Sequence, residues 1–249
     1  MAVSFKSALM PLAMAVALSF SAVGAASADA LTENFDNGIP LGWTTVNNSA
    51  PTGFTSWTTG NTDVFGAYDG SADSYVSSNY NAVLGSGTIS DWLILPTSTY
   101  RNGDTLSFFT RTDVNSSFPD NLEVRFSTVG GVDVGNTATS VGTFDTLLLT
   151  INPAQNVGGY PEFWTQYSVS LSGLTGDTTG AFALRYVLSD AGIDANNGNY
   201  IGIDSLDITS TPLAAVPEME TYLMMAAGLG LIGWMRKRKS RAVPASQQA

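Results

Sequence analysis

The sequence predicts an all-β fold, a single jelly-roll-like antiparallel β-sandwich that spans residues 31–211. Several segments of this region alternate apolar and polar residues, as strands with one buried face do. The chain holds 25 glycines and 10 prolines, and clusters rich in Gly, Asn and Asp separate these segments and favour turns. No window of this region repeats with the period of a helix, and no longer repeat of fixed period supports a propeller or a solenoid.

Four segments alternate most clearly, and each is predicted as a strand with its polar side facing solvent. In the first, Leu106 and Phe108 share one face. In the second, Leu122, Val124 and Phe126 lie opposite charged or polar neighbours. The predicted strands are residues 105–112, 122–127, 167–171 and 181–187.

The last predicted strand contains one irregularity. Its apolar residues Ile201 and Ile203 fall on odd positions, whereas Leu206 and Ile208 fall on even ones. A β-bulge at Asp204 would produce this change of parity, because a bulge inserts one residue and redirects the side chains around it. Asp204 is therefore a candidate for an inward-facing or rim-facing carboxylate with a specific partner.

The composition excludes most familiar catalytic chemistry. The chain has no cysteine and no histidine, so disulfides, Ser–His–Asp triads, thiolate nucleophiles and histidine-ligated metals are ruled out. The remaining template is a pair of carboxylates, as in glycosidases, but no motif selects such a pair. We expect no enzymatic activity, and a carboxylate-dependent polysaccharide hydrolase is the remote alternative.

The predicted sandwich is strongly acidic. Between Leu31 and Val216 there are 4 arginines, no lysine and 18 acidic residues, so this region carries a net charge of −14. A surface of this kind repels nucleic acid. It suits an exported protein kept soluble by charge, or one that binds divalent cations.

Residues 1–30 have the features of a signal peptide. Lys6 supplies the positive charge, and an apolar run extends from Ala8 to Val23. Two overlapping Ala-x-Ala sites follow, so cleavage is expected to leave a mature chain that starts near Asp29 or Leu31. We therefore expect the protein to be exported across the inner membrane.

The C-terminal region combines a short apolar segment with a basic end. The 14 residues from Tyr222 to Met235 would span about 21 Å as a helix, less than the ~30 Å of a hydrocarbon core. Their position before a basic cluster nevertheless favours a short transmembrane helix whose basic end faces the cytoplasm. The basic residues of this membrane stop are Arg236, Lys237, Arg238 and Lys239.

Together with the residues that precede it, this region resembles the PEP-CTERM sorting signal of Gram-negative bacteria. The resemblance covers residues 216–241, and residues 242–249 form a tail. Met219 stands where the family has a second proline. The resemblance implies processing by an exosortase, a membrane transpeptidase of bacteria that make extracellular polysaccharide. The residues that match the motif are Val216, Pro217, Glu218, Thr221 and Tyr222.

The predicted sandwich resembles a choice-of-anchor J domain, which is related to cleaved-adhesin domains and MAM-like jelly rolls. The resemblance implies a jelly roll with its first and last strands close together and with no established activity. The motifs that carry it follow one another in order: Glu33-Asn34-Phe35-Asp36, Gly42-Trp43, Ser90 to Pro96, Leu106 to Phe109, and Ile201 to Asp204.

The same resemblance suggests a structural Ca²⁺, because acidic residues of the first and last strands can meet around such an ion in jelly rolls of this kind. Ca²⁺ takes six to eight oxygen ligands. The acidic positions that match are Glu33, Asp36, Asp91 and Asp204. The alternative is that these carboxylates are solvated or hydrogen-bonded.

Aromatic side chains offer a second kind of site, because their flat faces stack on sugars. Trp43, Trp92 and Trp164 are expected in the core. The candidates for a glycan-binding surface are Tyr68, Tyr75, Phe118 and Tyr160.

The sequence therefore predicts an exported, non-catalytic surface or extracellular-matrix protein, sorted by an exosortase. Its expected role is adhesive or structural in the exopolysaccharide envelope, and a lectin-like carbohydrate-binding module is the alternative. Its expected partners are the exosortase, exopolysaccharide and, before processing, the membrane. Nucleic acid is excluded.

Overall fold

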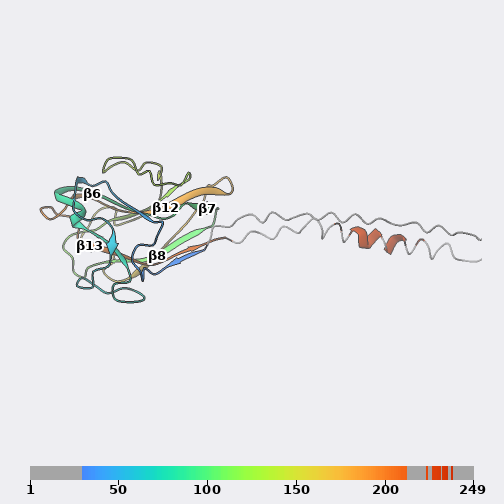
Figure 1. Ribbon diagram of the computed structural model, residues 1–249, viewed down its shortest axis with the longest axis horizontal. Helices are drawn as coiled ribbons and strands as arrows, with labels where there is room; N and C mark the ends of the chain where they lie inside the picture. The colour runs from blue at the N-terminus through green and yellow to red at the C-terminus, as the bar shows by residue number, and fades with distance from the viewer. Residues whose placement is uncertain (1–29, 212–222, 224–225, 231, 235–236, 238–249) are drawn as a thin grey trace, which may run out of the picture.

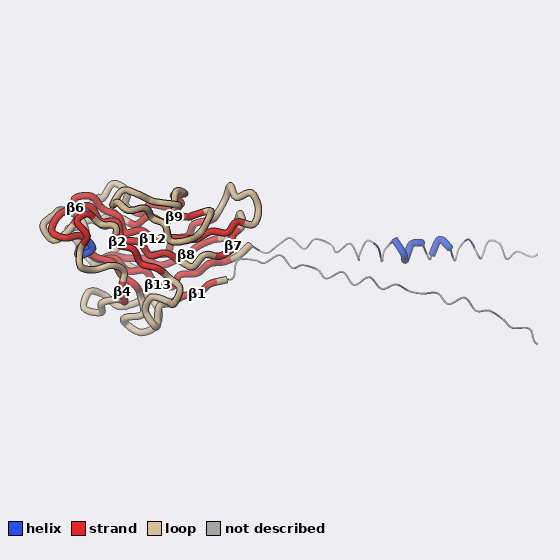
Figure 2. Tube along the Cα trace, turned by 45° about the horizontal axis from the view of Figure 1, so that its top comes forward, coloured by secondary structure: helices blue, strands red, loops and turns tan. Residues whose placement is uncertain are grey.

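Two antiparallel sheets, stacked face to face, make up the fold in the computed structural model (Figures 1 and 2). The structure describes residues 30–211, 223, 226–230, 232–234 and 237. Every strand lies between Leu31 and Thr209 in this described part. The predicted all-β sandwich is confirmed.

The first sheet has the strand order β11-β8-β13-β5-β4, and β1 pairs with β13 beside this path. Its strands are β1 (Leu31–Glu33), β4 (Thr58–Thr59), β5 (Val76–Asn79), β8 (Thr105–Thr112), β11 (Thr165–Ser170) and β13 (Tyr200–Thr209).

The second sheet has the order β10-β9-β12-β6-β2, with β3 paired to β6 and β7 paired to β12. A short 3₁₀ helix, η1 (Tyr80–Ala82), connects β5 of the first sheet to β6 of the second. The strands of the second sheet are β2 (Thr44–Asn47), β3 (Ala50–Thr52), β6 (Val83–Ile94), β7 (Ser98–Tyr100), β9 (Leu122–Ser127), β10 (Thr146–Ile151) and β12 (Thr178–Ala191).

The predicted alternation is clearest in β8, where buried and half-buried residues follow each other from Thr105 to Thr112. Leu106 and Phe108 point into the core between the sheets, as predicted. The same pattern places the alternate apolar residues of β9 in this core. Burying apolar area in this way supplies most of the driving force for the fold.

Strand β12 departs from the prediction, because both of its faces are buried over residues 180–186. The loop between β9 and β10, residues 128–145, covers the outer face of the second sheet. Its Val134 and Phe144 pack on Trp92 and Ala183. This second, smaller core is the reason why the polar side of β12 does not face solvent.

The first and last strands are neighbours, as the resemblance implied. Leu31 of β1 pairs with Ile208 of β13. The predicted β-bulge is also present, because the register between β13 and β8 shifts between Asp204 and Asp207. Ser205 has φ 47° at this point, a left-handed conformation that is uncommon outside glycine.

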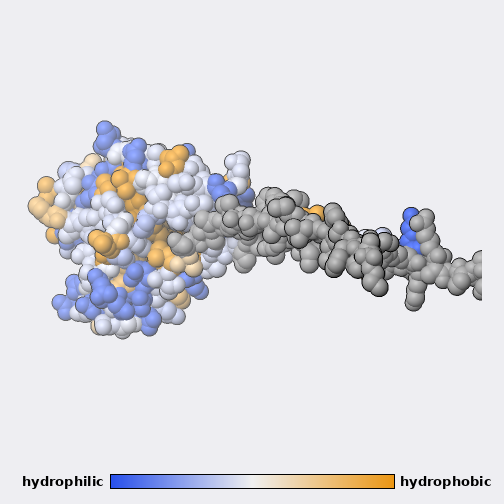
Figure 3. Space-filling view, turned by 45° about the vertical axis from the view of Figure 1, so that its right-hand side comes forward, coloured by the Kyte–Doolittle hydropathy of each residue, from blue (hydrophilic) through white to orange (hydrophobic). Residues whose placement is uncertain are grey.

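The two ends of the sandwich differ in what they carry. Strand β1 begins, and β13 ends, at one end, near β7 in Figure 2. Helix η1 lies at the opposite end. The β12–β13 loop (residues 192–199) and the β8–β9 loop (residues 113–121) lie there too, because Asn199 bonds to the Tyr80 amide and to Ser116. We call this opposite end the distal tip. On the face shown in Figure 3, apolar side chains form several small separate groups on a mostly polar surface.

Most of the predicted targeting residues lie outside the described part of the chain. These include residues 1–29, the motif residues Val216, Pro217, Glu218, Thr221 and Tyr222, and the basic residues Arg236, Arg238 and Lys239. Lys237 is described and is helical. Among the described residues, no helix has the length and apolarity needed to cross a membrane.

Candidate functional site

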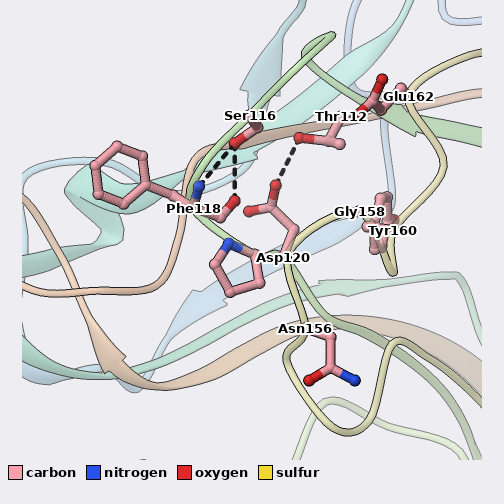
Figure 4. Close-up of a pocket in the computed structure, with 9 residues that line it drawn as sticks. Thr112, Ser116, Phe118, Asp120, Asn156, Gly158, Tyr160 and Glu162 are labelled. Atoms are coloured by element: carbon pink, nitrogen blue, oxygen red, sulfur yellow. Dashed lines mark hydrogen bonds between the residues drawn. The ribbon is translucent and has the colours of Figure 1, made fainter.

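A buried carboxylate organises the distal tip. Asp120 has no exposed surface. Its Oδ2 accepts a hydrogen bond from the Thr112 hydroxyl at 2.6 Å (Figure 4). Its Oδ1 accepts from the Tyr186 hydroxyl at 2.5 Å and from the Asn199 amide nitrogen at 2.8 Å. Burial raises the pKa of Asp120. One side chain thus joins β8, β12 and the residue that precedes β13.

A serine fixes the β8–β9 loop against the β12–β13 loop. Ser116 Oγ accepts from Asn199 Nδ2 at 2.9 Å and from the Phe118 amide at 3.1 Å, and it donates to the Phe118 carbonyl at 2.8 Å. The Phe118 ring points away from Asp120 in Figure 4. It is 48% exposed, so an aromatic ring is held at the surface by a rigid loop.

Helix η1 brings a second aromatic ring to the tip. The Asn79 side chain caps this helix by accepting from the Asn81 amide at 2.9 Å, the usual role of asparagine at this position. The Tyr80 amide donates to the Asn199 carbonyl at 3.0 Å. Tyr80 is half-buried, and its side chain is placed beside the β12–β13 loop.

Two adjoining hollows surround Tyr80, and we call them together the tip groove. The first, of 220 Å³, is lined by Tyr80, Phe118, Ile193, Asn199 and two glycines. The second, of 440 Å³, is also lined by Tyr80 and Asn199, so the two meet at these residues. The side chains that give the second hollow its polar character are Asn61, Asp63, Asn79, Asn81, Asp113 and Asn199.

A glycine gives the β12–β13 loop the shape that the groove needs. Gly192 has φ 120°. A Cβ at this position would lie 2.1 Å from the carbonyl oxygen of Gly85, far inside van der Waals contact. Only glycine combines this backbone conformation with this close approach.

The floor of the polar hollow rests on an aromatic cluster. Phe65, Tyr75 and Tyr200 are buried together, with Trp164 packed against them. The Tyr200 hydroxyl accepts from the Asn61 amide at 2.7 Å, and the Tyr75 hydroxyl lies 2.8 Å from the Asn61 carbonyl. Burial raises the pKa of Tyr75, and the nearby Tyr200 hydroxyl adds to this shift. The cluster thus positions the backbone of one groove wall.

The tip groove combines two kinds of lining side chain. Aromatic and aliphatic side chains line one half, and amides and carboxylates line the other. Such a pairing of an apolar face with a few oriented polar groups is typical of ligand sites. The lining residues include no lysine or arginine. The groove therefore favours neutral, hydroxyl-bearing molecules over anions.

The four predicted glycan-binding aromatic residues lie in different places and differ in exposure. Phe118 is at the tip groove and is exposed, as predicted. Tyr68 is 50% exposed but stacks on Phe109 at 3.8 Å, away from the groove. The prediction of a surface position is wrong for Tyr75 and Tyr160, which are 0% and 3% exposed.

Tyr160 is buried in the main core, and its hydroxyl finds a partner there in the Thr110 hydroxyl of β8, at 2.7 Å. Of the three tryptophans expected in the core, Trp92 is fully buried, whereas Trp43 and Trp164 are half-buried at its margin. Tyr80 lines the groove but was not among the four predicted glycan-binding residues. Its position between two asparagines is a helix-capping signal that could have found it.

Two of the predicted metal-binding carboxylates hold one loop, residues 66–74. Asp204 Oδ2 accepts from the Tyr68 amide at 2.7 Å and from the Asp69 amide at 3.1 Å. Asp204 Oδ1 accepts from the Ser205 amide at 2.6 Å. Asp36 accepts from the Ser74 hydroxyl at 2.8 Å. Asp204 therefore has the specific partners that the bulge predicted.

The other two carboxylates lie elsewhere. Asp91 is fully buried on β6, and Glu33 accepts from the Phe35 amide at 2.7 Å. The described part of the chain contains no group of three or more acidic side chains placed to hold a metal ion. Glu33, Asp36, Asp91 and Asp204 therefore do not form such a group in the described part of the chain. A structural Ca²⁺ stays a prediction.

Comparison with solved structures supports the fold. The K1 cleaved adhesin domain of Lys-gingipain from Porphyromonas gingivalis W83 is 23% identical, with a TM-score of 0.51 over 74% of this chain and 99% of that domain. The K3 cleaved adhesin domain of Lys-gingipain is 22% identical, with a TM-score of 0.47 over 74% of this chain and 98% of that domain.

A carbohydrate-binding module in complex with β-1,4-galactotriose is 11% identical, with a TM-score of 0.40 over 72% of this chain and 94% of the module. No family model and no curated protein matches the chain. The likeness to the K1 domain shows an adhesin-like β-sandwich fold, as the sequence predicted.

Proposed function

We propose that this chain is an exported, non-catalytic surface or extracellular-matrix protein that adheres to neutral polysaccharide through the tip groove. The observation that carries the proposal is the position of the groove. It lies at the end of the sandwich opposite to the end where β1 begins and β13 ends (Figure 2). A chain held at its terminal end would present the groove outward.

The proposed attachment follows from the order of the sequence. The sorting signal at residues 216–241 comes directly after the last strand, which ends at Thr209. Its motif, apolar segment and basic end support processing by an exosortase. Intact-mass measurement on the surface fraction tests this step. A surface form that still carries residues 236–249 would contradict it.

The groove favours carbohydrate recognition over a purely structural role. Tyr80 and Phe118 provide ring faces, and Asn81 and Asn199 provide amides beside them. A purely structural module does not need polar and aromatic groups oriented into one groove. The polysaccharide class proposed here is neutral, because Asp63 and Asp113 would repel a polyanion.

A pull-down on purified exopolysaccharide tests the proposal. Wild type and the Tyr68→Ala variant should be retained, because Tyr68 is exposed but lies away from the groove. Tyr80→Ala and Phe118→Ala should each weaken retention at least tenfold. Equal retention of all four proteins would contradict binding at the groove. Release of reducing ends by the wild type would instead support the hydrolase alternative.

A further inference from the structure

A second cleft lies on the outer face of the second sheet, apart from the tip groove. Its volume is 420 Å³, within the range of small-molecule sites. Strands β6, β9, β10 and β12 form its floor. The β9–β10 loop contributes Ala138 and Thr139 to one wall, and Pro153 and Gln155 contribute to another.

A buried arginine fixes one wall of this cleft. The guanidinium of Arg185 donates to the Ala138 carbonyl at 2.6 Å, to Ser90 Oγ at 3.1 Å and to Glu123 Oε2 at 3.1 Å. It also lies over the Trp92 ring, 4.8 Å from the ring centre. The contacts with Ser90, Glu123 and Trp92 fix the guanidinium on the sheet, and the bond to the Ala138 carbonyl ties the β9–β10 loop to it, so the cleft has a preformed shape.

The charges of the cleft compensate each other. Arg185 and Glu123 are the two charged residues that line it, and they form an ion pair. Glu123 is further paired with Arg125 at 2.6 Å. Neither charge is free to attract a charged ligand from solution. The cleft therefore favours an uncharged ligand.

One polar group on the cleft lacks a partner. Asn121 lies at the start of β9, lines the cleft and is 6% exposed. Its Oδ1 is buried and has no hydrogen-bond partner within the described part of the chain. Buried polar atoms in native proteins nearly always have a partner. A ligand hydroxyl that donated a hydrogen bond to Asn121 Oδ1 would satisfy this atom.

The other polar side chains that line the cleft can also form hydrogen bonds with a ligand. They are hydroxyls and one further amide, and no aromatic ring lines the cleft. Recognition here would use hydrogen bonds to hydroxyl groups, without the stacking available at the tip. The side chains concerned are Thr88, Thr139, Thr150, Gln155 and Ser189.

We propose that this cleft is a second binding site, which takes a neutral, hydroxyl-bearing saccharide unit anchored by the Asn121 amide. An extended peptide fits less well, because three of the four strands in the floor, β6, β9 and β12, pair with a strand on both sides and have no free backbone edge to offer. The fourth strand, β10, is at the edge of the sheet. The proposal does not depend on the tip groove. With two sites, one molecule could crosslink polysaccharide chains.

Titration calorimetry of the full chain tests the proposal. The probes are neutral hexaoses of β-glucan, xylan, mannan and galactan, with hexagalacturonate as the charged counterpart. Asn121→Leu removes the amide at similar volume, and it also removes a buried unpaired polar group, so the variant should fold. At least one neutral hexaose should bind wild type and lose tenfold or more in affinity with Asn121→Leu.

The tip variant Phe118→Ala serves as the matched control. Binding at the cleft should survive in Phe118→Ala, and hexagalacturonate should not bind there. On adding the hexaose, the backbone amide signals of Thr88, Val187 and Ser189 should shift in nuclear magnetic resonance spectra. If every neutral hexaose fails to bind, or binds Asn121→Leu as tightly as wild type, the cleft is not a saccharide site. Loss of binding in Phe118→Ala alone would leave the tip groove as the single site.

Discussion

Asp91 on β6 accepts a hydrogen bond from the Ser78 hydroxyl on β5 at 2.6 Å, and this bond joins the two sheets through the interior of the sandwich. The other oxygen of Asp91 accepts from the Ser56 hydroxyl, also at 2.6 Å. Burial raises the pKa of Asp91 to about 7, although both serine bonds favour the charged form. A carboxyl group that the sequence suggested as a metal ligand is thus a polar link between the sheets.

This raised pKa predicts a pH-dependent stability. The unfolded chain releases the Asp91 proton near pH 4, whereas the folded chain retains it until about pH 7. The free energy of unfolding should therefore fall as pH rises from about 4 to 7, by up to roughly 4 kcal/mol, and then level off. Asp120 and Asp204 act in the same direction, because burial raises the pKa of each.

Urea unfolding at pH 4.5 and pH 8 measures how much of this pH dependence of stability comes from Asp91. The Asp91→Asn variant keeps a hydrogen-bonding side chain but cannot titrate, so its stability should change less between the two pH values than that of wild type. The exposed Asp194→Asn serves as the control and should follow wild type. An unchanged pH dependence in Asp91→Asn would show that Asp91 is charged, or solvated, in the folded protein.

Asp120 should be among the most sensitive positions of the distal tip. Asp120→Ala leaves the Thr112 and Tyr186 hydroxyls and the Asn199 amide without their acceptor. At about 1–3 kcal/mol for each buried unsatisfied group, the expected loss of stability is about 3 kcal/mol or more. Chemical denaturation measures it, and Asp120→Asn, which keeps one acceptor oxygen, should lose less. A loss below 1 kcal/mol in Asp120→Ala would contradict this role.

Asp204 allows a test of the predicted Ca²⁺. Both carboxylate oxygens of Asp204 accept hydrogen bonds from backbone N–H groups. Asp204→Asn replaces one of these oxygens with an N–H donor, so the variant should lose about 1–3 kcal/mol of stability. Because these bonds need no ion, the loss in melting temperature should be equal in EDTA, Mg²⁺ and Ca²⁺ at fixed high ionic strength. A loss that is greater in Ca²⁺ than in EDTA would assign Asp204 as a ligand.

The strands that could be predicted from the sequence are those with one face buried and the other facing solvent. Strand β8 matches the alternation at every position, and the bulge at Asp204 was visible as a change of parity. The buried outer face of β12 could not be predicted in this way. It depends on Phe144 of a long loop folding back onto Trp92, and such a contact leaves no periodic signal.

The candidate site was predictable only in part. Phe118 was recognised as an exposed loop aromatic, but Tyr75 and Tyr160 have the same local sequence features and are buried. Tyr75 and Tyr160 differ from Phe118 in that each has a hydroxyl, whose partner comes from a distant strand or loop. The tip groove likewise joins Tyr80, Phe118 and residues 192–199, which only the fold brings together.

The most direct test of the proposed function is to map where polysaccharide touches the protein. Oligosaccharides released from the purified exopolysaccharide should shift the backbone amide signals of Tyr80, Asn81, Phe118 and Asn199 in nuclear magnetic resonance spectra. Residues at the opposite end, such as Asn102, should not shift. If the oligosaccharides bind but shift only signals away from η1 and the β12–β13 loop, or if they do not bind at all, the tip groove is not the adhesive surface.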